Sequence, residues 1–285
     1  FQRLRNFITY RIAATLQLLC FFFIAVLSLK PKNFMPDNWE SDSSFNDDEW
    51  PDFFKMPVLM LMLITLLNDG TLISIGYDNV TPSRTPNKWN LPALFLVASV
   101  LAFVALISSL WLLWAALDSW NDGGIFQELG LGGLTYGQIT TTIYLKVSIS
   151  DFLTLFSSRT HDGFFWSSKP SPILLGAAGV ALALSTVLAC AWPDSTPDDI
   201  DAVGLARKTP KDLAVWIWLY CIVCWFIQDL FKVGTYAIME KYNVFGINDT
   251  LMDVDSDEEG AQGEGEEDSL LPSERGLKEK LISSV

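Results

Sequence analysis

The chain has 285 residues, of which about 50% are hydrophobic and 18% are charged, and its formal net charge is −14. A soluble domain carries roughly 25% charged residues, whereas here the apolar residues form long unbroken blocks. A simple soluble globule, a disulfide scaffold and a disordered chain are therefore excluded. Most of the acidic excess lies in residues 249–268, which hold 10 acidic and no basic residues. No basic stretch suited to nucleic acid is present, so nucleic acid is not an expected partner.

Six stretches are apolar over the roughly 20 residues that a membrane helix needs. We therefore expect an all-α fold, a polytopic membrane bundle of six transmembrane helices within residues 7–245, embedded in the lipid bilayer. The spans are expected at residues 7–29, 57–77, 93–117, 137–157, 172–192 and 213–239. Residues 246–285 are acidic and rich in Gly and Glu, so we expect them to form a disordered tail.

The distribution of Lys and Arg between the loops predicts the orientation. With the N-terminus inside, the inner segments 1–6, 78–92 and 158–171 and the outer loops hold six basic residues each. The inner segments are about half as long in total, so the density of basic residues favours this arrangement. Six spans then return the C-terminus to the cytosol, and the acidic loop 30–56 faces outside.

Ionisable groups inside a span cost roughly 2.5–3.5 kcal/mol each and mark function by default. The third and fifth spans have none. One amide, Gln17, lies deep in the first span. The other four spans hold a small set of charged residues: Arg11, Asp69, Lys146, Asp151, Asp229 and Lys232.

Asp69 is the only acid of the second span and lies in Leu66-Leu67-Asn68-Asp69-Gly70-Thr71. Its immediate neighbours are poor helix formers, so we expect the helix to loosen there and to turn backbone carbonyls toward a ligand. Irregular backbone in the middle of a membrane is tolerated only where it is packed inside the protein or lines a cavity. Calcium needs six to eight oxygens, whereas one carboxylate is enough for a proton. The sequence therefore favours a proton site at Asp69 over a carboxyl that merely pairs with a neighbouring helix.

The remaining charges differ in how they can be satisfied. Asp229 and Lys232 are spaced i,i+3, so they can pair within one helix. Lys146 and Asp151 are five residues apart, about 140° around a helix, so at least one needs a partner on another span. The C-x-x-C of Cys221 and Cys224 lies in an apolar block, where two membrane-embedded thiols are the expected interpretation.

The quoted residues resemble a known family, the P-type plasma-membrane proton ATPases, over roughly residues 1–245. Phe1-Gln2-Arg3 is similar to the end of the family's cytosolic stalk, so residues 1–6 are expected to belong to it. The family motif around the proton-carrying aspartate of the sixth span resembles Leu67-Asn68-Asp69-Gly70-Thr71. Further similarity, strongest to algal and protist members, lies in Tyr77-Asp78-Asn79, in Lys88-Trp89-Asn90-Leu91-Pro92, in Tyr144 to Asp151, and in Phe164-Phe165-Trp166.

This resemblance implies the membrane half of an ATP-driven proton pump, beginning at the fifth span, with Asp69 as proton carrier and Asn68 stabilising its protonated carboxyl. The plant family's arginine aligns with Gln17, so Lys146 is a candidate for the missing internal cation, or else pairs with Asp151 or Asp229. Arg11 and Asp151 complete the candidate gating or counter-ion residues. ATP and Mg²⁺ are implied for the full-length pump, but no phosphorylation or nucleotide motif occurs here, so we expect a fragment that depends on the missing N-terminal half.

Two other classes of function stay open from the sequence. One is a six-span ion channel or secondary carrier, although neither an inverted repeat nor a filter loop is visible. The other is a membrane-embedded regulatory or assembly subunit. In the tail, Ser284-Val285 resembles the phosphorylatable end that recruits 14-3-3 proteins in plant members, and residues 266–271 have acidic dileucine spacing. By resemblance, the plasma membrane is the expected location.

Overall fold

The computed structural model describes residues 2–36, 50–79, 90–121, 123–160, 163–193, 198, 200, 202–206 and 211–244. The fold is all-α, as predicted. Six of its helices are long and apolar enough to cross a membrane. They are α1 (Gln2–Ser28), α2 (Val58–Ile75), α3 (Leu91–Leu117), α5 (Tyr136–Ser158), α6 (Pro172–Cys190) and α7 (Leu213–Lys241). Short elements η1 (Pro31–Phe34), η2 (Asp118–Trp120) and α4 (Ile125–Glu128) lie between spans.

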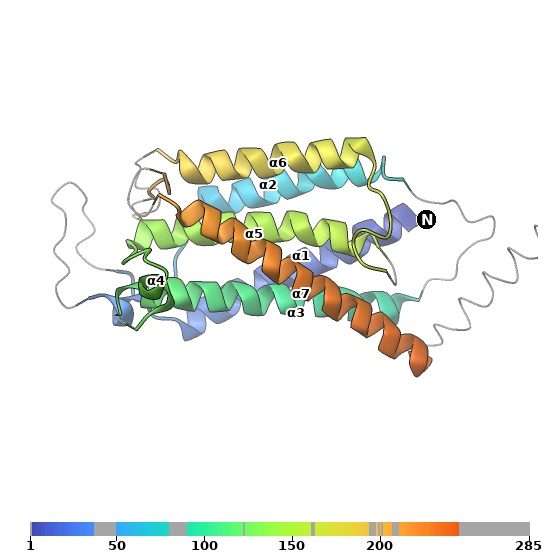
Figure 1. Cartoon of the computed structure of the whole chain (residues 1–285), viewed down its shortest axis with the longest axis horizontal. Helices are drawn as coiled ribbons and strands as arrows, with labels where there is room; N and C mark the ends of the chain where they lie inside the picture. Colours follow the sequence, from blue (N-terminus) through green and yellow to red (C-terminus); the bar gives the residue numbers. More distant parts are fainter. Residues whose placement is uncertain are drawn as a thin grey trace, which may run out of the picture.

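Helix α5 is the centre of the bundle. It contacts α1, α2, α3, α6 and α7, whereas α2 and α6 run side by side along one flank and α3 lies with α1 and α7 on the other (Figure 1). Almost every residue of α5 is buried. This position explains why α5 is the least apolar span: its polar side chains face neighbouring helices that can bond to them, and lipid offers no such partners.

The start of α5 is fixed by a capping box. Thr135 Oγ1 accepts from the Gln138 backbone N–H, and the Gln138 side chain accepts from the Thr135 N–H. Two backbone donors that have no partner within the helix are thereby satisfied. The phenol of Tyr136 also donates to the Lys55 carbonyl at 2.7 Å and accepts from the Lys55 N–H at 2.8 Å. The central helix is therefore tied to the segment that leads into α2.

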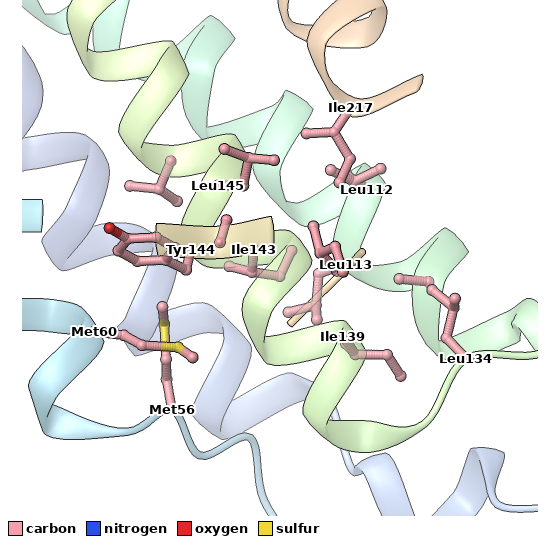
Figure 2. Close-up of a cluster of buried hydrophobic side chains, with 14 of the residues drawn as sticks. Met56, Met60, Leu112, Leu113, Leu134, Ile139, Ile143, Tyr144, Leu145 and Ile217 are labelled. Atoms are coloured by element: carbon pink, nitrogen blue, oxygen red, sulfur yellow. The ribbon is translucent and has the colours of Figure 1, made fainter. Parts of the chain in front are cut away.

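A hydrophobic cluster packs around the first half of α5. Figure 2 shows Ile139, Ile143 and Tyr144 of this helix beside Met60 of α2 and Leu113 of α3, all of them buried. The outward faces of the peripheral helices are also apolar, and large side chains such as Leu19 and Val180 are exposed there. Such faces suit a bilayer, in which lipid tails replace water. The chain is thus built as a multi-pass integral membrane protein.

Several sequence predictions fall outside the described residues. These are the disordered tail at 246–285 with Ser284 and the dileucine segment, and the Lys88–Pro92 motif up to Trp89. Residues 2–6, expected as the end of a stalk, are continuous with α1.

Candidate functional site

Asp69 forms an ion pair with Arg11 of the neighbouring helix. Arg11 Nη1 donates to Asp69 Oδ1, so the pair joins α1 to α2 across 58 positions of sequence. Both side chains lie on the outer face of the bundle, with 48% of Arg11 and 54% of Asp69 exposed. The exposed residues of α2 near Asp69 include Leu66 and Ile73. A charged pair on an otherwise apolar face is costly against lipid, so this face is suited to contact with protein or water.

The helix around Asp69 is regular, so the expected loosening is wrong. Helix α2 continues from Val58 to Ile75, and the Thr71 hydroxyl donates to the Leu67 carbonyl within it. Gly70 has ordinary helical geometry, and apart from its chain neighbours and the nearby backbone of α2 no atom lies within 4 Å of where its Cβ would be. Poor helix formers cost at most about 1 kcal/mol each, which is less than the several kcal/mol that unpaired backbone groups cost inside a membrane. The helix therefore holds.

Asn68 points away from Asp69. Consecutive residues are about 100° apart around a helix, and Asn68 is turned into the bundle while Asp69 is turned outward. The Asn68 Nδ2 donates to Asp151 Oδ2 of α5 at 2.7 Å, and both residues are buried. The expected hydrogen bond from Asn68 to the Asp69 carboxyl is therefore not formed. The Asp69 carboxyl and the Asp151 carboxyl, which is hydrogen-bonded to Asn68, therefore lie on different sides of the same turn of α2.

Lys146 is fully buried and is held by α3. Its Nζ donates to the Ala105 carbonyl at 3.0 Å, to Ser108 Oγ at 2.9 Å and to Ser109 Oγ. Among the described residues no carboxylate lies within ion-pair distance of this ammonium. The prediction that at least one of Lys146 and Asp151 has a partner on another span is confirmed, and the static pairing of Lys146 with Asp151 or Asp229 is wrong.

The predicted pair on the last span is present and extends further. Lys232 Nζ lies 2.8 Å from Asp229 Oδ1, at the expected i,i+3 spacing. It also donates to the Ser157 carbonyl and to the Thr160 hydroxyl, while Asp229 accepts from the Phe165 N–H. The pair thus fastens the end of α5 and the following turn to α7, which is a structural role.

Comparison with known proteins adds to this geometry. No family model matches the chain. It is 50% identical over 253 residues, 86% of its length, to "Probable proton ATPase 1B" of Leishmania donovani, and equally to "Probable proton ATPase 1A" of that organism. The chain is a relative of the P-type proton ATPases. It is also 28% identical over 251 residues, 85% of its length, to "Probable plasma membrane ATPase" of Dictyostelium discoideum.

The chain spans about a quarter of the length of these proton ATPases: 25% of each Leishmania protein and 21% of the Dictyostelium protein. The geometry adds one point to the proton ATPase resemblance. Gln17 is buried in α1, and its Nε2 has no hydrogen-bond partner among the described residues. The cation that contacts Asp69 is Arg11, nearly two turns earlier on the same helix. Arg11 therefore supplies a charge beside the motif aspartate that Gln17 cannot supply.

Sequence reasoning missed a buried cluster at the end of the bundle near the N-terminus. Asp78 follows α2, and its carboxylate accepts from Arg159 Nε at 2.8 Å, Arg159 Nη2 at 2.9 Å and the Ser171 N–H at 3.1 Å. The Asp78 carbonyl accepts from Arg3 Nε of α1, and Asn6 of α1 donates to the Arg159 carbonyl. The cluster therefore joins α1, α2, α5 and the loop before α6. Arg159 counted only as a basic residue of segment 158–171, and Asp78 stood in the family similarity at Tyr77-Asp78-Asn79. The indication that could have joined them was that both lie just after a predicted span.

Proposed function

We propose that the chain is the membrane part of an ATP-driven pump that exports protons, with Asp69 as the proton carrier and Arg11 as its counter-ion. The observation that carries this proposal is the Arg11–Asp69 pair between two membrane helices, set in the motif that resembles the proton ATPases. ATP and Mg²⁺ belong to the full-length pump, in the parts of it that this chain does not contain. The full-length pump would have further membrane helices, and these would pack against the face of the bundle that exposes the Arg11–Asp69 pair.

The chemistry of the pair suits proton release. A guanidinium keeps its charge at every accessible pH, so it cannot carry the proton itself. It competes with a proton for the same carboxylate oxygen of Asp69. When Arg11 moves away, the carboxylate can bind a proton from the cytosol. When Arg11 returns, contact with the ionised carboxylate favours departure of that proton toward the outside.

The cluster around Asp78 gives this exchange a mechanical link. Arg3 and Asn6 lie in the first two turns of α1, and both bond to the cluster formed by Asp78 and Arg159. A displacement of the N-terminal end of α1 would therefore act on the end of α2, one and a half turns beyond Gly70. Export against 100 mV costs about 2.3 kcal/mol per proton, and ATP used elsewhere in the pump supplies it. In the proposed pump both termini are cytosolic and the membrane is the plasma membrane. A 14-3-3-like regulator is a candidate partner at Ser284.

The test is the Asp69→Asn variant of the full-length pump in reconstituted vesicles. Asparagine keeps the shape of the side chain but cannot take up a proton, so ATP-driven acidification should fall to the background level. The matched control is Asp52→Asn, which neutralises an exposed acid in the loop before α2 and should leave acidification unchanged. ATP-dependent phosphorylation, measured in parallel, shows that the variant is folded. Normal acidification by Asp69→Asn would mean that the proton takes another route.

A further inference from the structure

Two buried oxygens face no hydrogen-bond donor although their own side chains are bonded to each other. Asn68 Nδ2 donates to Asp151 Oδ2 at 2.7 Å. Among the described residues, Asn68 Oδ1 and Asp151 Oδ1 have no hydrogen-bond partner, and 7% and 2% of these residues are exposed. An unsatisfied buried acceptor costs about 1–3 kcal/mol. Two such oxygens in one contacting pair therefore need an explanation.

No described cation neutralises Asp151. Lys146, on the same helix, directs its ammonium to three oxygens of α3. On the other side, the buried phenol of Tyr10 on α1 interacts electrostatically with Asp151 and with Asp69, whose carboxyl is paired with Arg11. A carboxylate alone in a membrane interior is costly, whereas the neutral acid is not.

The helices on the remaining sides add no counter-charge. The residues of α3 include no titratable side chain, and those of α6 include only Cys190. On α7, Asp229 and Lys232 are paired with each other, and Cys221 and Cys224 are free cysteines. The bond from Asn68 is thus the one polar contact of the Asp151 carboxyl within the described chain.

We propose that Asp151 is a second proton-binding site, in which the carboxyl is protonated and hydrogen-bonded to the amide of Asn68. A carboxylate brings two acceptors, whereas a carboxyl brings an O–H donor and an acceptor, and a side-chain amide brings both kinds. The bound proton forms an O–H on Asp151 Oδ1 that donates to Asn68 Oδ1, while Asn68 Nδ2 still donates to Asp151 Oδ2. One proton therefore satisfies both unpaired oxygens. Flipping the amide does not remove this requirement, because a planar amide edge always presents one acceptor.

The site deepens the proposed function, because Asn68 and Asp69 are consecutive on α2. A proton on Asp151 fixes Asn68, which lies on the buried side of α2. Asp69 lies on the exposed side of the same turn. Protonation of Asp151 itself does not depend on transport, so the two proposals fail separately. Chemically, the ligand is one proton, bound in the membrane interior without a metal or an organic cofactor.

The test is infrared spectroscopy of the purified full-length protein in lipid vesicles at neutral pH. Asp151→Asn should remove one C=O stretching band of a protonated carboxylic acid, and this band should shift in the wild type on transfer to D₂O. Asn68→Leu should keep the band but move it to higher frequency, because the hydrogen bond to Asp151 is lost. This second variant leaves Asp151 in place and so does not depend on how well Asp151→Asn folds.

The control is Asp69→Asn, which should leave the band of Asp151 intact whatever it does to acidification. Loss of the carboxylate stretching bands in Asp151→Asn, with no loss in the carboxylic acid region, would show that Asp151 is ionised and would overturn the proposal. An unchanged acid band in Asn68→Leu would likewise overturn the pairing with Asn68. Normal transport by Asp69→Asn, with the Asp151 band present, would reject the proposed function while leaving this site.

Discussion

The ion pair between Asp78 and Arg159 is expected to be the strongest single polar contact that holds the spans together. Its side chains are 2% and 4% exposed, and Arg159 contacts both carboxylate oxygens. In the variant Asp78→Asn one oxygen becomes an NH₂ group. Both oxygens of Asp78 accept from N–H groups, one of them from Arg159 and Ser171 together. Either orientation of the amide therefore places two donors against each other.

The magnitude follows from the charge that is left behind. Removal of one partner from a buried ion pair costs about 3–5 kcal/mol, because the other charge stays buried without compensation. We expect Asp78→Asn to lower the free energy of unfolding by about 3 kcal/mol, which is more than a hundredfold in the unfolding constant. The matched control is Asp52→Asn, whose partner Lys32 is 3.7 Å away and exposed. A surface pair of this kind is worth about 1 kcal/mol or less.

The assay is equilibrium unfolding in mixed micelles, followed by tryptophan fluorescence as the fraction of denaturing detergent rises. A double-mutant cycle with Arg159→Gln separates the pair from its surroundings. Contacting residues show coupling energies of about 0.5–3 kcal/mol. The double variant should therefore lose clearly less stability than the sum of the losses in the two single variants. Additive losses, or a loss for Asp78→Asn no larger than that for Asp52→Asn, would refute the role given to this pair.

Two further variants test other parts of the bundle. Lys146→Met should change the free energy of unfolding by less than about 1 kcal/mol or raise it, because the variant no longer buries a charge that has no carboxylate partner among the described residues. Ser109→Ala, which leaves the ammonium short of one acceptor, should instead destabilise in the same assay, and the opposite ranking would contradict this account. Gly70→Ala should be neutral or stabilise by up to about 1 kcal/mol, because Gly70 is helical and has open space at its Cβ position. The variant should also retain ATP-driven acidification, and loss of transport with intact folding would restore the view that α2 must loosen there.

The sequence was sufficient for the features that depend on local spacing. Apolar stretches of span length located six helices, because the hydrogen-bonding needs of the backbone leave few alternatives in a membrane. The i,i+3 spacing of Asp229 and Lys232 predicted their contact, because the helix alone brings them together. The angle of about 140° between Lys146 and Asp151 correctly predicted partners on other spans. In each case the geometry of one helix decides the answer.

The sequence could not supply what depends on how helices are rotated against each other. Nothing local says whether Asn68 or Asp69 faces the centre of the bundle, since both sides of α2 carry apolar residues as well. Arg11 and Gln17 both lie in α1, and only packing decides which of them meets Asp69. The Asp78–Arg159 pair was missed for the same reason. It joins the ends of two spans that are 81 positions apart.

The central helix connects these observations, because its lysine and its aspartate do not pair with each other. Lys146 and Asp151 are separated by about 7.5 Å along the axis of α5. With an effective dielectric constant near 20, opposite unit charges at about 8 Å attract by roughly 2 kcal/mol. Because the two side chains point about 140° apart around α5, this attraction does not bring them into contact. Instead, the ammonium is bound by neutral oxygens of α3, and Asp151 contacts the amide of Asn68. This arrangement is the one that a neutral, protonated Asp151 would favour.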